Sequence, residues 1–343
     1  MKKNRTSLIL TLLLVLVAVY FLFFKDSFST LSQKDNDFAV QDTAAVTKIF
    51  MADKNNRTAT LTRVKGGHWM INGKYDVRSD AMNTLLYTIK MVSVKDIIDT
   101  NGIRNVLHAL SSGGIKVEIY QGDKRVKVYY VGGPSADQTG TFMLLANSNS
   151  GENFKTPYIV YIPGFEGYLT TRYFLHEEDW RDRTVWHYFP YQLRAVMVSY
   201  PQSDSGFEIN ILGRNRFSLD HSNGQPISVF DTISVKQYLT YFQSVSWNVT
   251  VETKSEDSIL HSVPIAIISV KDTLGKTSEV RLFSKKAKSD AVDKNGKKYE
   301  HDPDQMFALI NGKDFVMVQY YVFGKMLQNF TYFSRPHVGT VEK

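Results

Sequence analysis

Alternation of apolar and polar residues recurs along most of the chain, with a period of two that is typical of half-buried β-strands. In the first half it predicts strands at residues 46–52, 58–64, 68–71, 115–120, 126–131, 141–145 and 158–162. In the second half it predicts strands at residues 195–200, 207–212, 216–219, 265–270, 279–283, 306–310 and 315–321. Turn signals such as Asn72-Gly73 and Asn223-Gly224 separate neighbouring strands, which favours antiparallel hairpins.

The period changes to that of a helix in both halves of the chain. From Ser79, a candidate N-cap, apolar side chains at helical spacing predict a helix whose apolar face is buried: Met82, Leu85, Leu86 and Ile89. A second short helix is predicted over residues 103–110, and Gly113-Gly114 would end it. In the second half, Ser228 or Asp231 is expected to cap a helix that buries one apolar face: Val235, Tyr238, Leu239, Phe242 and Val245.

The order of elements in the second half repeats that of the first, displaced by roughly 150 residues. We therefore predict an α+β fold with two related antiparallel-sheet modules, residues 46–172 and 195–333, each with one main helix. Residues 173–194 would link the modules and residues 334–343 would form a tail. The alternative is two unrelated α+β segments that share only a general composition.

An apolar run near the N-terminus, residues 8–24, contains no charged side chain and follows Lys2, Lys3 and Arg5. In hydrocarbon every backbone polar group must be bonded internally, so a spanning run of this kind must be helical. We predict a single-pass transmembrane helix, with residues 1–26 as cytoplasmic tip and anchor and residues 27–45 as a stalk. Because positive residues stay on the cytoplasmic side, the bulk of the chain would be exported.

A cleaved signal peptide is the alternative interpretation of this run, because it has the same basic start and apolar middle. Cleavage needs small residues after the apolar core. Here the run ends in the bulky residues Tyr20, Phe21, Leu22, Phe23 and Phe24, and Ser27-Phe28-Ser29 offers only a late site. The pattern therefore favours an uncleaved anchor.

Composition excludes several classes of protein and site. The chain of 343 residues has 0 Cys, which rules out disulfides, thiolate metal sites and a lipidated N-terminal cysteine. The formal net charge is +7, and three of these charges lie before the apolar run. The excess in the exported part is mild, so nucleic acid is not predicted as a partner.

No sequence motif for a known catalytic or cofactor chemistry is present, so neither a catalytic residue nor a cofactor is predicted. The densest polar segment covers residues 176–187 and supplies the only candidate site, a set of charged and imidazole side chains: Glu177, Glu178, Asp179, Arg181, Asp182 and His187. Its carboxylates could hold a hard cation such as calcium, or act as an acid/base pair. The structural interpretation is that Arg and Asp side chains pair with each other while Trp180 and Trp186 pack beneath them.

Several segments together resemble an uncharacterised family of bacterial envelope proteins, the domain of unknown function 4340. The resemblance spans about residues 47–186 and is carried by short stretches: 47–50, Trp69 to Tyr75, Tyr130 to Gly133, Gly140 to Phe142, Pro157-Tyr158, Ile162 to Leu169, and Trp180 to Arg183. It implies an N-terminal anchor and an exported β-rich body. The family has no established catalytic residues that could be transferred to this chain.

These observations favour a noncatalytic protein of the bacterial inner membrane whose C-terminal bulk lies in the periplasm. The membrane would be contacted through residues 8–24, and a further envelope protein is the expected partner. Relatives that lie beside transporter components suggest a docking or accessory subunit of a membrane complex. The alternative function is an exported hydrolase or glycan-binding protein that uses the 176–187 segment.

Overall fold

The computed structural model describes residues 36–253 and 255–334, which form two compact units that divide between Asp182 and Arg183. The predicted anchor at residues 8–24 and residues 335–343 of the predicted tail lie outside the described part of the chain. In the described part, no helix is long and apolar enough to cross a membrane.

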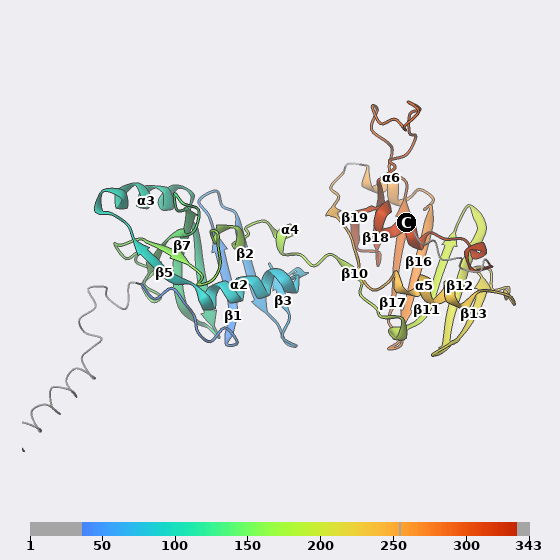
Figure 1. Cartoon of the computed structure of the whole chain (residues 1–343), viewed down its shortest axis with the longest axis horizontal. Coiled ribbons are helices and arrows are strands. Elements are labelled where there is room, and N and C mark those ends of the chain that lie inside the picture. Colours follow the sequence, from blue (N-terminus) through green and yellow to red (C-terminus); the bar gives the residue numbers. More distant parts are fainter. Residues whose placement is uncertain (1–35, 254, 335–343) are drawn as a thin grey trace, which may run out of the picture. The chain divides into compact units, whose positions relative to one another are not determined.

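The first unit is built on one nine-stranded antiparallel sheet (Figure 1). Its strands are β1 (Val46–Ala52), β2 (Thr58–Arg63), β3 (Trp69–Ile71), β4 (Tyr75–Asp76), β5 (Ser93–Ile97), β6 (Ile115–Gln121), β7 (Lys124–Pro134), β8 (Thr141–Ala146) and β9 (Tyr158–Tyr161). Its helical elements are α2 (Ser79–Met91), α3 (Thr100–Gly113), η2 (Thr170–Arg172) and α4 (Glu177–Trp180).

The second unit is built on an eight-stranded antiparallel sheet. Its strands are β11 (Leu193–Tyr200), β12 (Ser203–Gly213), β13 (Arg216–His221), β15 (Val249–Thr250), β16 (Ala266–Asp272), β17 (Thr277–Phe283), β18 (Gln305–Ile310) and β19 (Asp314–Gln319). A separate two-stranded sheet pairs β10 (Thr184–Trp186) with β14 (Val245–Ser246). The helical elements are η3 (Pro190–Gln192), α5 (Thr232–Thr240), α6 (Glu256–Leu260), α7 (Tyr320–Phe323), η4 (Gly324–Met326) and η5 (Phe330–Ser334).

The two large sheets have corresponding strand orders. The first runs β4-β3-β2-β1-β6-β7-β8-β9-β5 and the second runs β13-β12-β11-β16-β17-β18-β19-β15. Apart from β4, each strand of one sheet has a counterpart at the same place in the other. This includes β5 and β15, which form the edge beside the final strand in sequence, β9 or β19. In both units the main helix follows the edge hairpin, α2 after β4 and α5 after β13. The structure therefore confirms a β-rich chain made of two similar modules.

An irregularity in pairing recurs at the same place in both modules. Between β1 and β6 the register shifts between Val46 and Lys48, and between β11 and β16 it shifts between Leu193 and Ala195. A bulge adds one residue to one strand, so it fixes the register on either side of itself. The shared bulge aligns Val46 with Leu193 and Ile49 with Val196.

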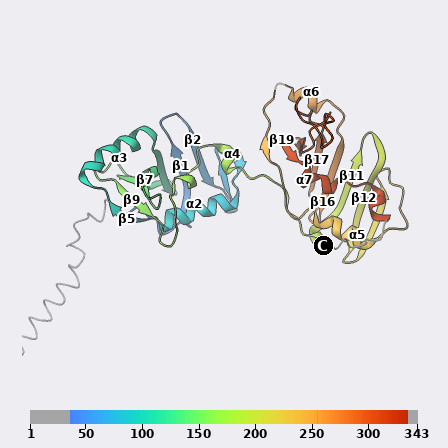
Figure 2. The same cartoon turned by 45° about the horizontal axis from the view of Figure 1, so that its top comes forward.

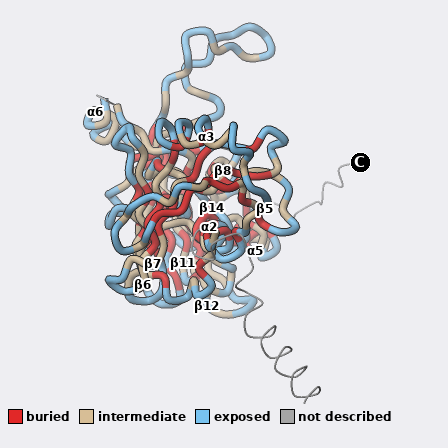
Figure 3. Tube along the Cα trace, turned by 90° about the vertical axis from the view of Figure 1, so that its left-hand side faces the viewer, coloured by how far each residue is buried: buried red, intermediate tan, exposed pale blue. Residues whose placement is uncertain are grey.

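Each module has its own hydrophobic core between its sheet and its main helix, and Figures 2 and 3 show the helices on the sheets and the buried strands. In the first module Met82, Leu85 and Ile89 of α2 are buried against one sheet face. Helix α3 buries Val106 and Leu110 with Leu144 in a separate small cluster. In the second module Asp231 caps the N-terminus of α5, and its carboxylate accepts hydrogen bonds from the Ile233 and Ser234 amides.

Parts of the sequence prediction were wrong in detail. Leu86 was expected to be buried with its neighbours but is only partly buried. The second main helix ends at Thr240, so Phe242 and Val245 are buried from the segment after it rather than from its face. Residues 27–45 were expected as a stalk, yet Phe38 and Val40 pack into the first core.

Candidate functional site

The expected linker, residues 173–194, divides between the two cores. Tyr173, Leu175 and Trp180 are buried in the first module, and Trp186 and Leu193 in the second. The polar segment 176–187 therefore belongs to two separate units, with Glu177 to Asp182 in one and His187 in the other.

Within the first module, the acidic residues of the short helix α4 contact the β3–β4 hairpin. The Asn72 amide donates a hydrogen bond of 2.7 Å to the Glu177 carboxylate. The backbone of Trp180 accepts from the Arg78 amide, and the Asp182 amide donates to the carbonyl of Asp76. These bonds join α4 and the residues after it to the β3–β4 hairpin and to the residue that precedes α2.

Arg181 lies at the centre of this contact. It is buried, its guanidinium lies 3.7 Å from the centroid of the Tyr75 ring, and it forms an ion pair of 3.7 Å with Glu178. Asp182 and His187 are exposed, and Asp179 is partly exposed. In the described residues, no group of three or more His, Asp or Glu side chains could hold a metal ion. The geometry shows α4 and Arg181 closing one end of the first core.

Replacing Arg181 by alanine should lower the free energy of unfolding of the first module by about 1–3 kcal/mol. The change removes the packing of Arg181 on Tyr75 and the ion pair between Arg181 and Glu178. Glu178→Gln should cost less, about 0–1 kcal/mol, because that carboxylate is partly exposed and its pair is screened by water. Urea denaturation followed by circular dichroism would measure both. A larger cost for Glu178→Gln than for Arg181→Ala would contradict this interpretation.

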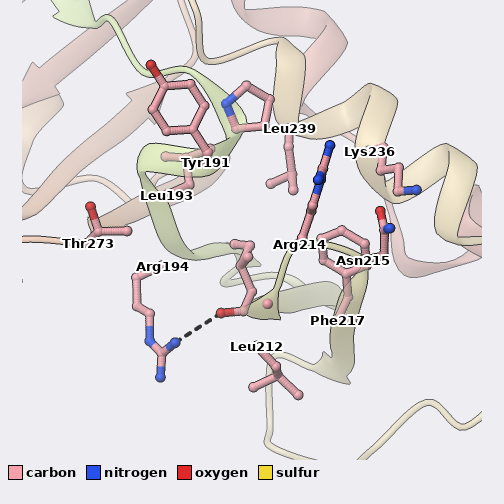
Figure 4. A pocket seen from close by; sticks show the side chains of 13 residues that line it. Tyr191, Leu193, Arg194, Leu212, Arg214, Asn215, Phe217, Lys236, Leu239 and Thr273 are labelled. Carbon is pink, nitrogen blue, oxygen red and sulfur yellow. Dashed lines mark hydrogen bonds between the residues drawn. The ribbon is translucent and has the colours of Figure 1, made fainter.

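A cavity of about 700 Å³ lies in the second module, between the end of the β11–β12–β13 sheet and α5. Its apolar walls come from Leu193, Ile211, Phe217 and Leu239, and its rim carries Tyr191 and Leu212. Figure 4 shows the Arg214 side chain extending past Phe217 and Leu239, with Lys236 and Asn215 beyond it. The volume lies in the range of small-molecule sites.

The charged residues that line the cavity are all cationic: Arg194, Arg214 and Lys236. They come from three elements, namely β11, the β12–β13 turn and α5. Arg194 donates one hydrogen bond of 3.1 Å to the carbonyl of Ile211. In the part of the chain that the structure describes, neither the Arg214 guanidinium nor the Lys236 ammonium group forms a hydrogen bond or ion pair with another residue. The cavity therefore combines an apolar interior with a positively charged mouth.

The acidic side chains near this cavity are directed elsewhere. The buried Asp272 carboxylate accepts hydrogen bonds from the Leu274 and Lys276 amides, which closes the β16–β17 turn. It also accepts a bond of 3.4 Å from the Tyr188 hydroxyl, and burial followed by the Asp272 charge raises the pKa of that phenol. Glu208 and Asp220 alternate with core residues on β12 and β13, so they lie on the opposite sheet face.

Two aromatic rings are exposed beside the cavity mouth. Phe189 and Tyr191 stack on each other with 5.7 Å between ring centroids and an angle of 4° between planes. Their exposed fractions are 47% and 75%. The Gln192 side chain accepts a hydrogen bond from the Phe189 amide, and the Gln192 carbonyl accepts one from Thr273. These bonds hold the η3 turn that presents the rings.

The chain matches no model of a protein family, no curated protein and no solved structure. The resemblance to the envelope family therefore stays a prediction. The sequence pattern did not indicate the cavity, since its walls come from four segments between residues 190 and 273. The available signal was the basic turn Arg214-Asn215-Arg216 between two predicted strands.

Proposed function

We propose that this protein is a noncatalytic docking or accessory subunit of a bacterial envelope complex. Residues 8–24 would hold it in the inner membrane, and the two modules would lie in the periplasm. The charge-free run behind three basic residues supports the anchor and its orientation. The two similar modules, each with a complete core, support a body that presents surfaces to a partner.

The exposed ring pair Phe189–Tyr191 carries the docking proposal. Large aromatic side chains bury much area at small cost in conformational entropy, so they are enriched where proteins bind one another. Here two rings stack in solvent and Leu212 adds a third exposed apolar side chain at the same cavity mouth. Clustered exposed apolar side chains of this kind mark interaction surfaces.

Site-directed photo-crosslinking in membranes tests both parts of this proposal. A benzophenone amino acid would replace Tyr191 in the full-length chain, and the membranes would be illuminated first and washed in alkaline carbonate afterwards. We expect the full-length chain to stay in the membrane pellet and to form one discrete larger adduct. Adding Phe189→Ala should reduce the adduct severalfold, because the neighbouring ring orders residue 191.

The matched control places the same amino acid at Tyr299, which is 40% exposed. Tyr299 directly follows the lysine-rich segment 285–298. This position should give little or no discrete adduct. Equal adducts at residues 191 and 299, or none at 191, would contradict docking through the ring pair. Release of a shortened chain by carbonate would contradict the anchor.

A further inference from the structure

The shared register of the two modules shows which residues of the second correspond to residues of the first. The aligned bulge pairs Ile49 with Val196, and these residues lie opposite Leu61 and Ile209 on the next strand. Two residues further along those strands, Arg63 corresponds to Ile211. Because Arg63 lies opposite Trp69 and Ile211 opposite Phe217, Trp69 corresponds to Phe217.

In the first module, a cation and an indole ring fill this place. The guanidinium of Arg63 lies 5.0 Å from the centroid of the Trp69 ring, and Trp69 is buried. Arg63 also donates hydrogen bonds to the carbonyls of Thr43 and Ala44, just before β1. The long side chain therefore connects the strand face to the segment that leads into the module.

In the second module, smaller apolar side chains stand at both positions. Ile211 does not reach as far as arginine, and Phe217 has a smaller ring system than tryptophan. Counting back from the bulge, Thr43 and Ala44 correspond to Pro190 and Tyr191, and these two residues line the cavity. The cavity therefore occupies the place that Arg63 and Trp69 fill in the first module.

The two modules also differ in the cationic side chains at this place. In the first module Arg63 bonds to two backbone carbonyls, whereas three cations line the cavity of the second module, and only Arg194 among them bonds to a carbonyl: Arg194, Arg214 and Lys236. Held together without an acidic partner among the lining residues, these side chains repel one another. An anion at the mouth would relieve that repulsion and gain charge-assisted hydrogen bonds.

We propose that this cavity binds a small amphipathic anion, with a ring or short acyl body carrying one carboxylate, sulfonate or phosphate group. The apolar body would lie on Phe217 and Leu239, and the anionic group would lie at the mouth among Arg214, Lys236 and Arg194. A volume of about 700 Å³ suits a ligand of this size. This proposal does not rest on the partner proposed above, although Tyr191 and Leu212 belong to both surfaces.

Fluorine NMR of 4-(trifluoromethyl)phenylacetate with the detergent-solubilised full-length protein tests the proposal. The neutral 4-(trifluoromethyl)phenylacetamide has nearly the same shape and measures the contribution of charge. Wild-type protein and variants share the same micelles, so differences between them report on the protein. We expect the acid to bind wild type at least tenfold more tightly than the amide, and its affinity to fall as salt screens the cations.

Two charge-reversal variants distinguish binding in the cavity from a general attraction of the acid by the net charge of the protein. Arg214→Glu with Lys236→Glu should weaken acid binding at least tenfold and change amide binding less than threefold. Lys297→Glu with Lys298→Glu makes the same change in charge on exposed residues outside the cavity and should leave both affinities unchanged. Arg214→Gln with Lys236→Gln should give an intermediate loss.

A third variant copies the first module into the second. Ile211→Arg with Phe217→Trp should fill the cavity and remove binding of both compounds, while circular dichroism reports the fold. The proposal would be overturned if wild type bound neither compound at millimolar concentration or bound both equally. It would also be overturned if the Arg214/Lys236 variant bound the acid as wild type does. These outcomes leave the crosslinking at residue 191 unaffected, so the two proposals can fail separately.

Discussion

Replacing Trp186 by alanine should lower the free energy of unfolding of the second module by about 3–5 kcal/mol. The Trp186 side chain is 1% exposed, and its ring lies 5.3 Å from that of Phe242 and 6.1 Å from that of Phe323. Its indole N–H donates a hydrogen bond of 3.1 Å to the Ser278 hydroxyl. Alanine would leave a large cavity and remove the donor to that hydroxyl.

Trp180→Ala is the matched control, because Trp180 is equally buried but belongs to the first module. Its ring lies 5.1 Å from that of Phe174, and its N–H donates to the Phe174 carbonyl at 3.0 Å. Each core is complete within its own unit, so calorimetry of the full chain should show that each variant lowers the melting temperature of only one transition. Both variants shifting the same transition would contradict independent modules.

The alternation of side chains predicted most of the sheet strands because each of them buries one face in a core. Strand β1, for example, covers Val46 to Ala52 as expected and buries Val46, Ile49 and Met51, which alternate with less buried residues except at the bulge. The repetition of one topology was also accessible, because the order of elements along the chain repeats, but the strand order within each sheet was not predicted. The membrane run was equally clear in the sequence but lies outside the described residues.

The edge strands β5 and β15 could not be predicted by the same reasoning. Strand β5 has the sequence SVKDI and buries no residue fully, and β15 has only two residues. Both are held by hydrogen bonds to the last strand of their sheet, β9 or β19. A strand that is held mainly by backbone hydrogen bonds does not need to bury one face, so its sequence need not alternate apolar and polar residues.

The candidate sites show a similar limit. The polar segment 176–187 was predicted as a candidate site because its charged residues are adjacent in sequence. The two units divide after Asp182, so these residues belong to different units. The cavity has the opposite property, since its residues are separated in sequence and meet through the register of β11, β12 and β13. Its relation to Arg63 and Trp69 becomes visible only when the two sheets are compared strand by strand.

Among apolar residues of the two predicted main helices, we expect a large difference between Phe242 and Leu86, although both fit a helical period in the sequence. Phe242 is 0% exposed, and its ring lies 5.3 Å from Trp186 and 5.7 Å from Tyr238. Leu86 is only partly buried at the edge of the first core. Phe242→Ala should therefore cost about 3–5 kcal/mol in the second module, and Leu86→Ala about 1 kcal/mol in the first.

Urea denaturation with fluorescence and circular dichroism would measure both costs, with Leu85→Ala as the control for a fully buried position on α2. Leu85→Ala should cost about 2–5 kcal/mol, because its side chain is removed from water completely in the folded module. A cost for Leu86→Ala equal to that for Leu85→Ala would show that α2 buries a wider face than the structure indicates. A small cost for Phe242→Ala would mean that the segment after α5 does not close the second core.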